Sequence, residues 1–305
     1  MKIRIFAFVM SILFVTVACG LSNTISLNQN SVATVVAATL QSMATDVNTA
    51  VTEPAIPPTN LPPAVTDAPP TEPSGIAWSF QNSSIVIPPG LANAASGEIV
   101  PEMNETNSPP WDIAPEHILL TLTGYPLARE GYVPMIHIYP ADQYFQVNQG
   151  GGNSLSRLRA ILASPAAPLI KDVLPSVPFY NAAQLYAAQP IRLKFLSGEG
   201  VRMVSESAQY PAPILQDASY YHFEGLTSDG KYFIVAVFPV NVPLQATIDN
   251  PSADGIPFPG EAGDETAFTN YYLAITDTLN QASPESFQPS LKDLDALIGS
   301  IKITP

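Results

Sequence analysis

The segment from Glu53 to Pro73 constrains the fold of this chain more than any other feature. It holds eight prolines in twenty-one residues, interleaved with Thr and Ala. Proline has no backbone N–H to donate and its ring obstructs the preceding helical turn, so such a segment neither continues a helix nor pairs inside a sheet. We expect an extended polyproline II spacer of roughly 60 Å, at about 3 Å per residue. The spacer divides the chain into a short N-terminal part and a longer C-terminal part.

The N-terminus has the layout of an export signal. Lys2 and Arg4 are followed by thirteen mostly apolar residues, Ile5 to Val17, and then by the small residue Ala18. A positive start, a short apolar run and small residues at the cleavage site are typical of a secretory leader. A helix that spans a bilayer needs about 20 apolar residues, so this run is at the short limit for a permanent anchor.

The single cysteine of the chain, Cys19, follows this leader directly. Thr16-Val17-Ala18-Cys19-Gly20 resembles the lipobox of bacterial lipoproteins, in which the cysteine is lipidated and becomes the first mature residue. The resemblance implies a signal peptide over residues 1–18 and a lipid anchor on Cys19, and two or more acyl chains hold a protein stably on a membrane. The family usually has Leu, Val or Ile where this chain has Thr16. Because Thr16-Val17-Ala18 also suits an ordinary signal peptidase, simple secretion and an uncleaved anchor remain alternatives.

Residues 19–75 are predicted to form a lipid-anchored, low-complexity stalk. Between Ser31 and Val51 apolar residues recur every three or four positions, which indicates a transient or stalk helix or, alternatively, a short self-association seam. No Lys or Arg lies between Arg4 and Arg129. We therefore expect a tether that holds the C-terminal part away from the bilayer.

The charge of the chain excludes some partners. Its formal net charge is −14, and removal of residues 1–18 takes away two basic residues and no acidic one, which leaves about −16. Such a charge argues against nucleic acid and against binding to anionic lipid head groups by electrostatics. With one cysteine no disulfide forms within the chain, so an exported domain depends on burial of its core.

Residues 76–115 are expected to be an extended arm with short strands, docked through Trp78 and Trp111 onto a globular domain over residues 116–305. A domain of about 190 residues is long enough to bury a sizeable core. Runs of branched and aromatic residues predict its first strands, at 118–122, 133–139, 191–196 and 201–205.

The clearest local signal is a hairpin between residues 220 and 240. Two aromatic-rich runs flank Asp229-Gly230, and Asp-Gly between such runs favours a tight hairpin turn. The run from Lys231 to Phe238 is apolar on both faces, which indicates a central strand.

A helix over residues 155–162 is predicted earlier in the chain. It follows a glycine triplet, and Asn153 or Ser154 is expected to be its N-cap.

Two helices are predicted to close the chain. Their apolar stripes include Tyr271 and Ile275 in the first and Leu294 and Leu297 in the second, and Ser290 begins a partial capping box. The predicted class is therefore α+β: a single domain with a mainly antiparallel sheet covered by helices. The order of its last elements is similar to PsbP-like α/β/α folds, and this resemblance concerns the fold alone.

Candidates for chemistry are sparse. His117, His137 and His222 are the only histidines, and none has the three- or four-residue spacing of a local metal-binding pair. There is no Gly-x-Ser-x-Gly elbow. The acidic loop over 249–265 lacks EF-hand spacing, and the glycine triplet lacks the Lys-Ser/Thr end of a phosphate loop. We expect no catalytic residue, no cofactor and no metal site.

Aromatic residues gather around the predicted hairpin, and Tyr220, Tyr221 and Tyr232 are the candidate binding residues. An exposed patch of tyrosines would bind carbohydrate or peptide. We expect an extracytoplasmic, membrane-anchored lipoprotein, on the cell surface or the periplasmic face, whose domain is a non-enzymatic binding or accessory module. An extracytoplasmic hydrolase with scattered active-site residues and a purely structural envelope component are the alternatives.

Overall fold

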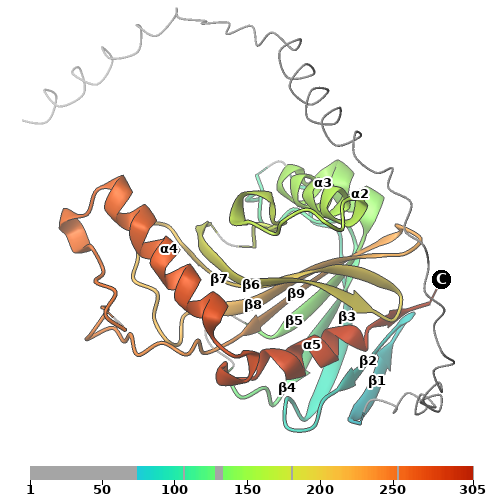
Figure 1. Cartoon of the computed structure of the whole chain (residues 1–305). Coiled ribbons are helices and arrows are strands. Elements are labelled where there is room, and N and C mark those ends of the chain that lie inside the picture. The colour runs from blue at the N-terminus through green and yellow to red at the C-terminus, as the bar shows by residue number, and fades with distance from the viewer. Residues whose placement is uncertain (1–73, 106, 128–132, 180, 253, 305) are drawn as a thin grey trace, which may run out of the picture. The chain divides into compact units, whose positions relative to one another are not determined.

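The computed structural model describes residues 74–304 except 106, 128–132, 180 and 253. The predicted signal peptide, Cys19 and the proline-rich spacer lie outside the described residues. Within the described ranges the chain forms one α+β domain built around antiparallel sheets (Figure 1), as predicted. No helix in these ranges has the length and apolar character needed to cross a membrane.

A seven-stranded sheet forms the middle layer of the domain, and every neighbouring pair of strands in it is antiparallel. In order across the sheet the strands are β3 (Ala94–Val100), β4 (His117–Thr123), β5 (Met135–Pro140), β9 (Tyr232–Pro239), β8 (Tyr220–Thr227), β7 (Gly198–Ala208) and β6 (Ala183–Phe195). A smaller sheet contains β1 (Ile76–Phe80), β2 (Ser83–Ile87) and β10 (Lys302–Ile303).

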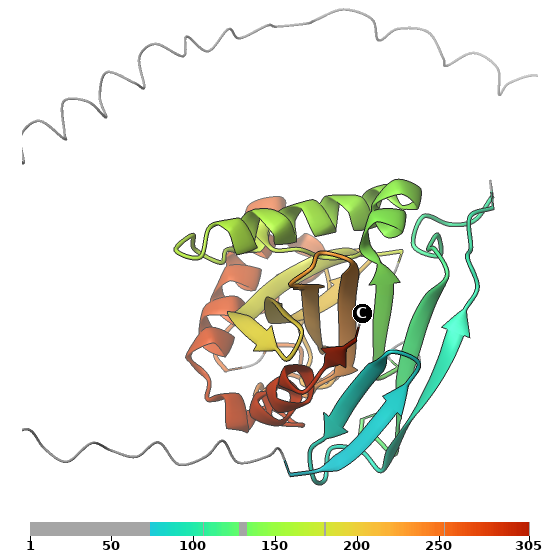
Figure 2. The same ribbon diagram turned by 90° about the vertical axis from the view of Figure 1, so that its right-hand side faces the viewer.

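Helices cover both faces of the large sheet (Figures 1 and 2). One face packs against α2 (Ala141–Val147) and α3 (Gln149–Ala163). The opposite face packs against α4 (Glu265–Gln281), α5 (Leu291–Gly299) and the small sheet. Short 3-10 helices occupy the connections Lys171–Val173, Gly260–Ala262 and Pro284–Ser286.

The sheet therefore separates two hydrophobic cores, and β9 contributes to both. Phe233 and Val235 pack towards α2 and α3, whereas Ile234 and Phe238 pack towards α4 and α5. This alternation confirms the prediction of a central strand that is apolar on both faces. The predicted hairpin is also confirmed, because β8 pairs with β9 and Gly230 adopts the positive φ of +74° that the turn requires.

Residues 76–115 are not a separate arm, and the predicted domain boundary at residue 116 is wrong. Strand β3 pairs with β4 along its whole length, so it is the edge strand of the main sheet. The β1–β2 hairpin lies beside it, and the ring of Phe80 covers Gly97 so closely that a Cβ there would clash. Residues 94–100 carry no local strand signal because an edge strand with one wet face needs few apolar residues.

Helix α3 begins earlier than predicted. Asn148 is its N-cap and accepts a hydrogen bond from the backbone N–H of Gly151, so the glycine triplet forms the first helical turn. A Cβ on Gly151 would overlap the ring of Tyr144 in α2. The glycines therefore allow α2 and α3 to approach closely, and the expected loop with a cap at Asn153 or Ser154 is not formed.

Candidate functional site

The three predicted binding tyrosines do not form one surface. Tyr220 and Tyr221 are consecutive on β8, so their side chains enter opposite faces of the sheet, where they are 4% and 0% exposed. Tyr232 begins β9, is half-buried and lines a separate hollow of about 280 Å³. Tyr221 and its hydroxyl group, which donates to Asp295, belong to the core. These three tyrosines therefore do not form the expected exposed patch, and two of them, Tyr220 and Tyr232, line cavities.

A buried carboxylate organises the face of β8 that packs against α3. Glu224 is fully buried, and its Oε2 accepts a hydrogen bond of 2.5 Å from the hydroxyl group of Ser154 in α3. Its Oε1 accepts from the backbone N–H of Val177 at 2.6 Å and lies 2.8 Å from Nε2 of His222. A buried carboxylate is tolerated only when donors surround it. Glu224 thus joins β8 to α3 and to the segment before β6.

The charge of Glu224 acts on the neighbouring aromatic residues. Burial raises the pKa of Tyr139 and of Tyr144 well above the ordinary value, and the nearby carboxylate of Glu224 raises them further. The two tyrosine rings stack 4.2 Å apart beside Phe233. Both phenols therefore remain neutral at every physiological pH and contribute packing rather than acid–base chemistry.

A small cavity of about 160 Å³ lies next to this cluster. Segment 176–179 forms one wall of it, and the ends of β6, β7 and β8 contribute Gln184, Ser207, Tyr220 and His222. The hydroxyl groups of Ser207 and Tyr220 lie 2.7 Å apart. Nε2 of His222 faces Glu224. The other ring nitrogen, Nδ1, has no hydrogen bond to any residue that the structure describes. A ligand in this cavity would meet that nitrogen.

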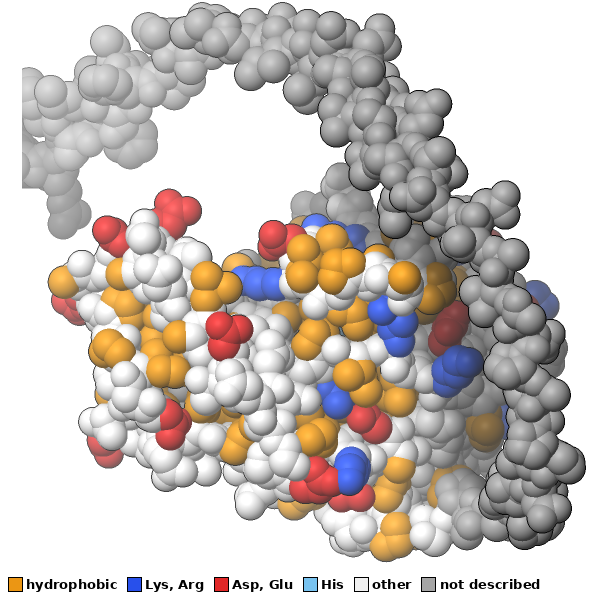
Figure 3. Space-filling model, in the orientation of Figure 1, with side chains coloured by type: hydrophobic (Ala, Val, Ile, Leu, Met, Phe, Trp, Pro, Cys, Tyr) orange, Lys and Arg blue, Asp and Glu red, His pale blue; other side chains and the backbone are white. Residues whose placement is uncertain are grey.

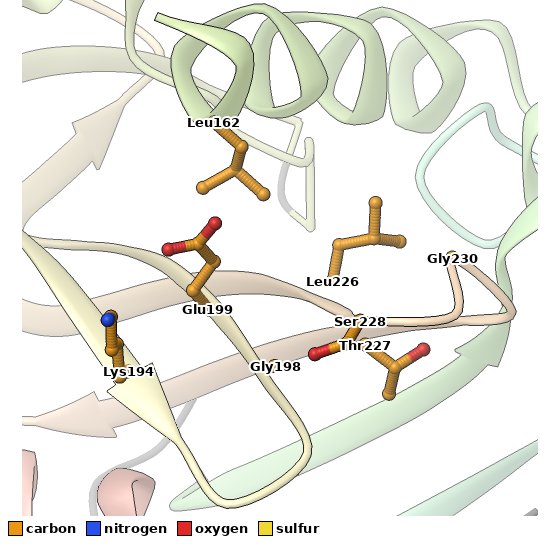
Figure 4. A pocket seen from close by; sticks show the side chains of 8 residues that line it. All are labelled: Leu162, Lys194, Gly198, Glu199, Leu226, Thr227, Ser228 and Gly230. Atoms are coloured by element: carbon orange, nitrogen blue, oxygen red, sulfur yellow. The ribbon is translucent and has the colours of Figure 1, made fainter. Parts of the chain in front are cut away.

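A larger and more open hollow of about 490 Å³ lies at the turn ends of the two hairpins (Figure 4). Leu162 reaches into it from α3, and Glu199 and Leu226 reach towards it from β7 and β8. Lys194 is opposite Glu199 in the β6–β7 register, so one positive and one negative side chain flank the hollow. The buried polar residue in its lining is Thr227, whose hydroxyl group is already bonded to Asp229 and to the backbone N–H of Tyr232. The hollow therefore offers little specific chemistry to a ligand.

A third hollow, also about 490 Å³, lies between α4 and the edge strand β6. Its exposed apolar side chains include Ile170 and Leu273, which are 54% and 57% exposed. Side chains occupy part of the strand edge: Lys171 Nζ donates to the carbonyl of Leu185, and Asn280 accepts from the N–H of Gln189. Such covering prevents a free edge from pairing with another chain.

The remaining histidines form a pair on the neighbouring strands β4 and β5. His117 on β4 and His137 on β5 approach to 3.0 Å between Nε2 and Nδ1. Burial lowers the pKa of His117, and burial followed by the neighbouring His117 lowers the pKa of His137 to about 3. Two neutral imidazoles therefore stand in contact, although their sequence spacing of 20 residues gave no sign of it.

Charged side chains elsewhere have structural roles. On the face drawn in Figure 3, acidic and basic side chains are interspersed with hydrophobic ones. In the acidic loop over residues 249–265, Asp264 caps α4 and Asp254 accepts a hydrogen bond from the N–H of Gln245. Among the described residues, no three His, Cys, Asp or Glu side chains gather in a way that would hold a metal ion.

Sequence reasoning missed Glu224 and Ser154. His222 and Glu224 are two positions apart on one strand, which places both on the same face, so this pair was available as a signal. Ser154 lies 70 residues away and meets Glu224 only through the packing of α3 on β8.

No family model, no curated protein and no solved structure matches this chain. The PsbP-like order of elements stays an expectation, although α5 does lead into a short final strand, β10. Functional inference therefore depends on the chemistry of the cavities.

Proposed function

We propose that this chain is a cell-envelope lipoprotein whose domain binds the hydroxyl-bearing end of a carbohydrate in the cavity beside His222. The leader, Cys19 and the proline-rich spacer support a position outside the cytoplasm on a membrane-held tether. The acidic composition supports a partner other than nucleic acid.

The observation that carries the binding proposal is the orientation of His222. Glu224 holds Nε2, and Nδ1 is left for a ligand in a cavity that also contains hydroxyl and amide groups. Ligand sites combine apolar walls with a few well-placed polar groups. Here Phe179 and Tyr220 supply aromatic walls, and Ser207 and Gln184 supply hydrogen-bonding groups. Such a set suits a sugar ring, which has apolar faces and a hydroxyl rim.

The volume limits the ligand. About 160 Å³ corresponds to roughly five water molecules at about 30 Å³ each, so the cavity has room for one sugar ring or a short end group. A peptide would insert a single side chain, and this is the competing outcome in a binding experiment.

The geometry favours binding over hydrolysis. A glycosidase needs a pair of carboxyl groups on either side of the scissile bond, and in the described part of the chain Glu224 is the one carboxylate hydrogen-bonded to His222, with both of its oxygens already engaged. Ser154 donates to Glu224 rather than to the histidine, so it is not arranged as a nucleophile with its base.

A blocking variant tests this proposal. Ala182 lines the cavity, whereas its neighbour Ala183 is exposed and does not. The purified chain is screened by saturation-transfer NMR against monosaccharides, disaccharides and dipeptides. We expect binding of at least one sugar, its loss in Ala182→Trp, and its retention in Ala183→Trp. Sugar binding that survives Ala182→Trp unchanged, or binding of dipeptides alone, contradicts the proposed site or ligand.

A further inference from the structure

A line of three polar contacts runs across the neighbouring strands β4 and β5, starting from the backbone carbonyl of Pro115. Nδ1 of His117 lies 2.8 Å from the carbonyl oxygen of Pro115, and Nε2 of His117 lies 3.0 Å from Nδ1 of His137. Nε2 of His137 then lies 3.2 Å from the thioether sulfur of Met135. Met135 and His137 are alternate residues of β5, so they share one face of the sheet.

The two histidine rings supply fewer N–H protons than these three contacts need for a hydrogen bond each. A carbonyl oxygen and a thioether sulfur only accept, and each neutral imidazole carries one N–H. Three contacts thus share two protons. The carbonyl oxygen of Pro115 is a far better acceptor than sulfur, so His117 donates to it and His137 donates to His117. The nitrogen left without a proton is Nε2 of His137, and its lone pair is directed at the sulfur of Met135.

The aromatic surroundings fix the orientation of that lone pair. The ring of His137 stacks on Tyr139 at 5.3 Å with an interplanar angle of 3°, and Phe179 lies 5.2 Å from it. Met135 is only partly buried and its side chain has three rotatable bonds, so the sulfur is the adjustable member of the pair.

We propose that Nε2 of His137 and the sulfur of Met135 bind a soft monovalent metal ion, copper(I). Imidazole and thioether together select copper(I), whereas magnesium and calcium prefer oxygen. Zinc lies about 2.0 Å from an imidazole nitrogen and about 2.3 Å from a cysteine sulfur, and we take similar lengths for an ion on the axis of the lone pair. The sulfur must therefore move outward by about 1 Å from its present 3.2 Å, which a rotation in the Met135 side chain supplies.

Silver(I), a redox-stable ion of the same charge and softness, is the probe. The full chain carries Cys19→Ala so that no thiol competes, and silver(I) is titrated while the methionine methyl groups and histidine rings are followed by NMR. We expect one ion per chain, with shifts at the Met135 methyl group and the His137 ring. Met135→Leu, a swap of similar volume, is expected to weaken binding by about tenfold or more.

Met103→Leu is the matched control, because Met103 is also partly exposed and lies outside the line of contacts. It is expected to leave the affinity unchanged. The proposal is overturned if the parent chain binds no silver(I) at micromolar concentration, if the Met135 methyl signal does not move, or if Met135→Leu binds as tightly as the parent. The methyl signal of the parent tests the site even if Met135→Leu fails to fold, and sugar binding at His222 does not enter the result.

Discussion

His222 and Glu224, two residues apart on strand β8, are joined by a contact of 2.8 Å between Nε2 and Oε1. Both side chains are almost completely buried. The carboxylate is held by donors from α3 and from the segment before β6, so the imidazole has a fixed orientation beside the cavity. This contact therefore connects the packing of the domain with the proposed ligand site.

Replacing Glu224 by Gln is expected to destabilise the domain by about 1–3 kcal/mol. The amide keeps one acceptor oxygen. Its NH₂ group replaces the other carboxylate oxygen, which accepted a hydrogen bond, and so faces a donor that loses its acceptor. The free energy of unfolding in urea measures the effect. Glu199→Gln, an exposed position on the neighbouring strand β7, is expected to change stability by less than about 0.5 kcal/mol. If both substitutions lower the free energy of unfolding equally, the buried hydrogen bonds of Glu224 do not stabilise the domain as we expect.

A buried ion pair holds α5 on the opposite face of the sheet. Nε of Arg202 in β7 lies 3.1 Å from Oδ1 of Asp295, and Nη2 lies 3.3 Å from Oδ2. Arg202 is 2% exposed, so Arg202→Met removes the partner of a partly buried carboxylate and is expected to cost about 3 kcal/mol. The exposed pair Lys231–Asp229 is the control, since Lys231→Met should cost less than about 1 kcal/mol. A loss for Arg202→Met no larger than this control would refute the structural role.

The stability of the domain is expected to fall at alkaline pH through its buried tyrosines. Burial raises the pKa of Tyr271 to about 12, whereas an unfolded tyrosine has a pKa of about 10. The folded state thus favours the neutral phenol, so this contribution is complete below pH 10 and is lost as the pH rises towards 12. Urea midpoints measured from pH 8 to 12 should show the decline.

Tyr271→Phe is expected to make that decline shallower while lowering stability at every pH, because the phenol oxygen accepts the N–H of Ile214. Tyr210→Phe, at a position that is 71% exposed, should leave the slope unchanged. An identical slope in the parent and in Tyr271→Phe would contradict the assignment.

Local signals allowed prediction of the α+β class and of most central elements. The β8–β9 hairpin was predictable because Asp229-Gly230 and its apolar flanks are adjacent in sequence, and α5 was predictable because Ser290 caps it, as the structure confirms. Strand β3 was missed because its partner, not its own composition, stabilises it. The contacts of Glu224 with Ser154 and Val177 join residues 70 and 47 positions apart, and no local pattern encodes such distances.

The lipid anchor is tested by Cys19→Ala. If the diacylated cysteine holds the chain, the variant should move from the membrane fraction to the soluble fraction, because no acyl chain can be attached. Ser22→Ala should stay with membranes. An uncleaved leader would keep both variants on the membrane, and ordinary secretion would release even the parent chain, so fractionation followed by mass spectrometry of the N-terminus distinguishes the three outcomes.

The central claim is that His222 presents a nitrogen to the ligand. Long-range ¹H–¹⁵N NMR of the histidine rings addresses it directly, since the chain has three histidines and His222→Gln identifies one set of signals. We expect Nε2 of His222 to carry a proton, in accord with its contact to Glu224, and its Nδ1 signal to shift on addition of a bound sugar while the His117 and His137 signals stay in place. A sugar that binds without moving the Nδ1 signal of His222, or a His222 whose Nε2 carries no proton, would contradict the account.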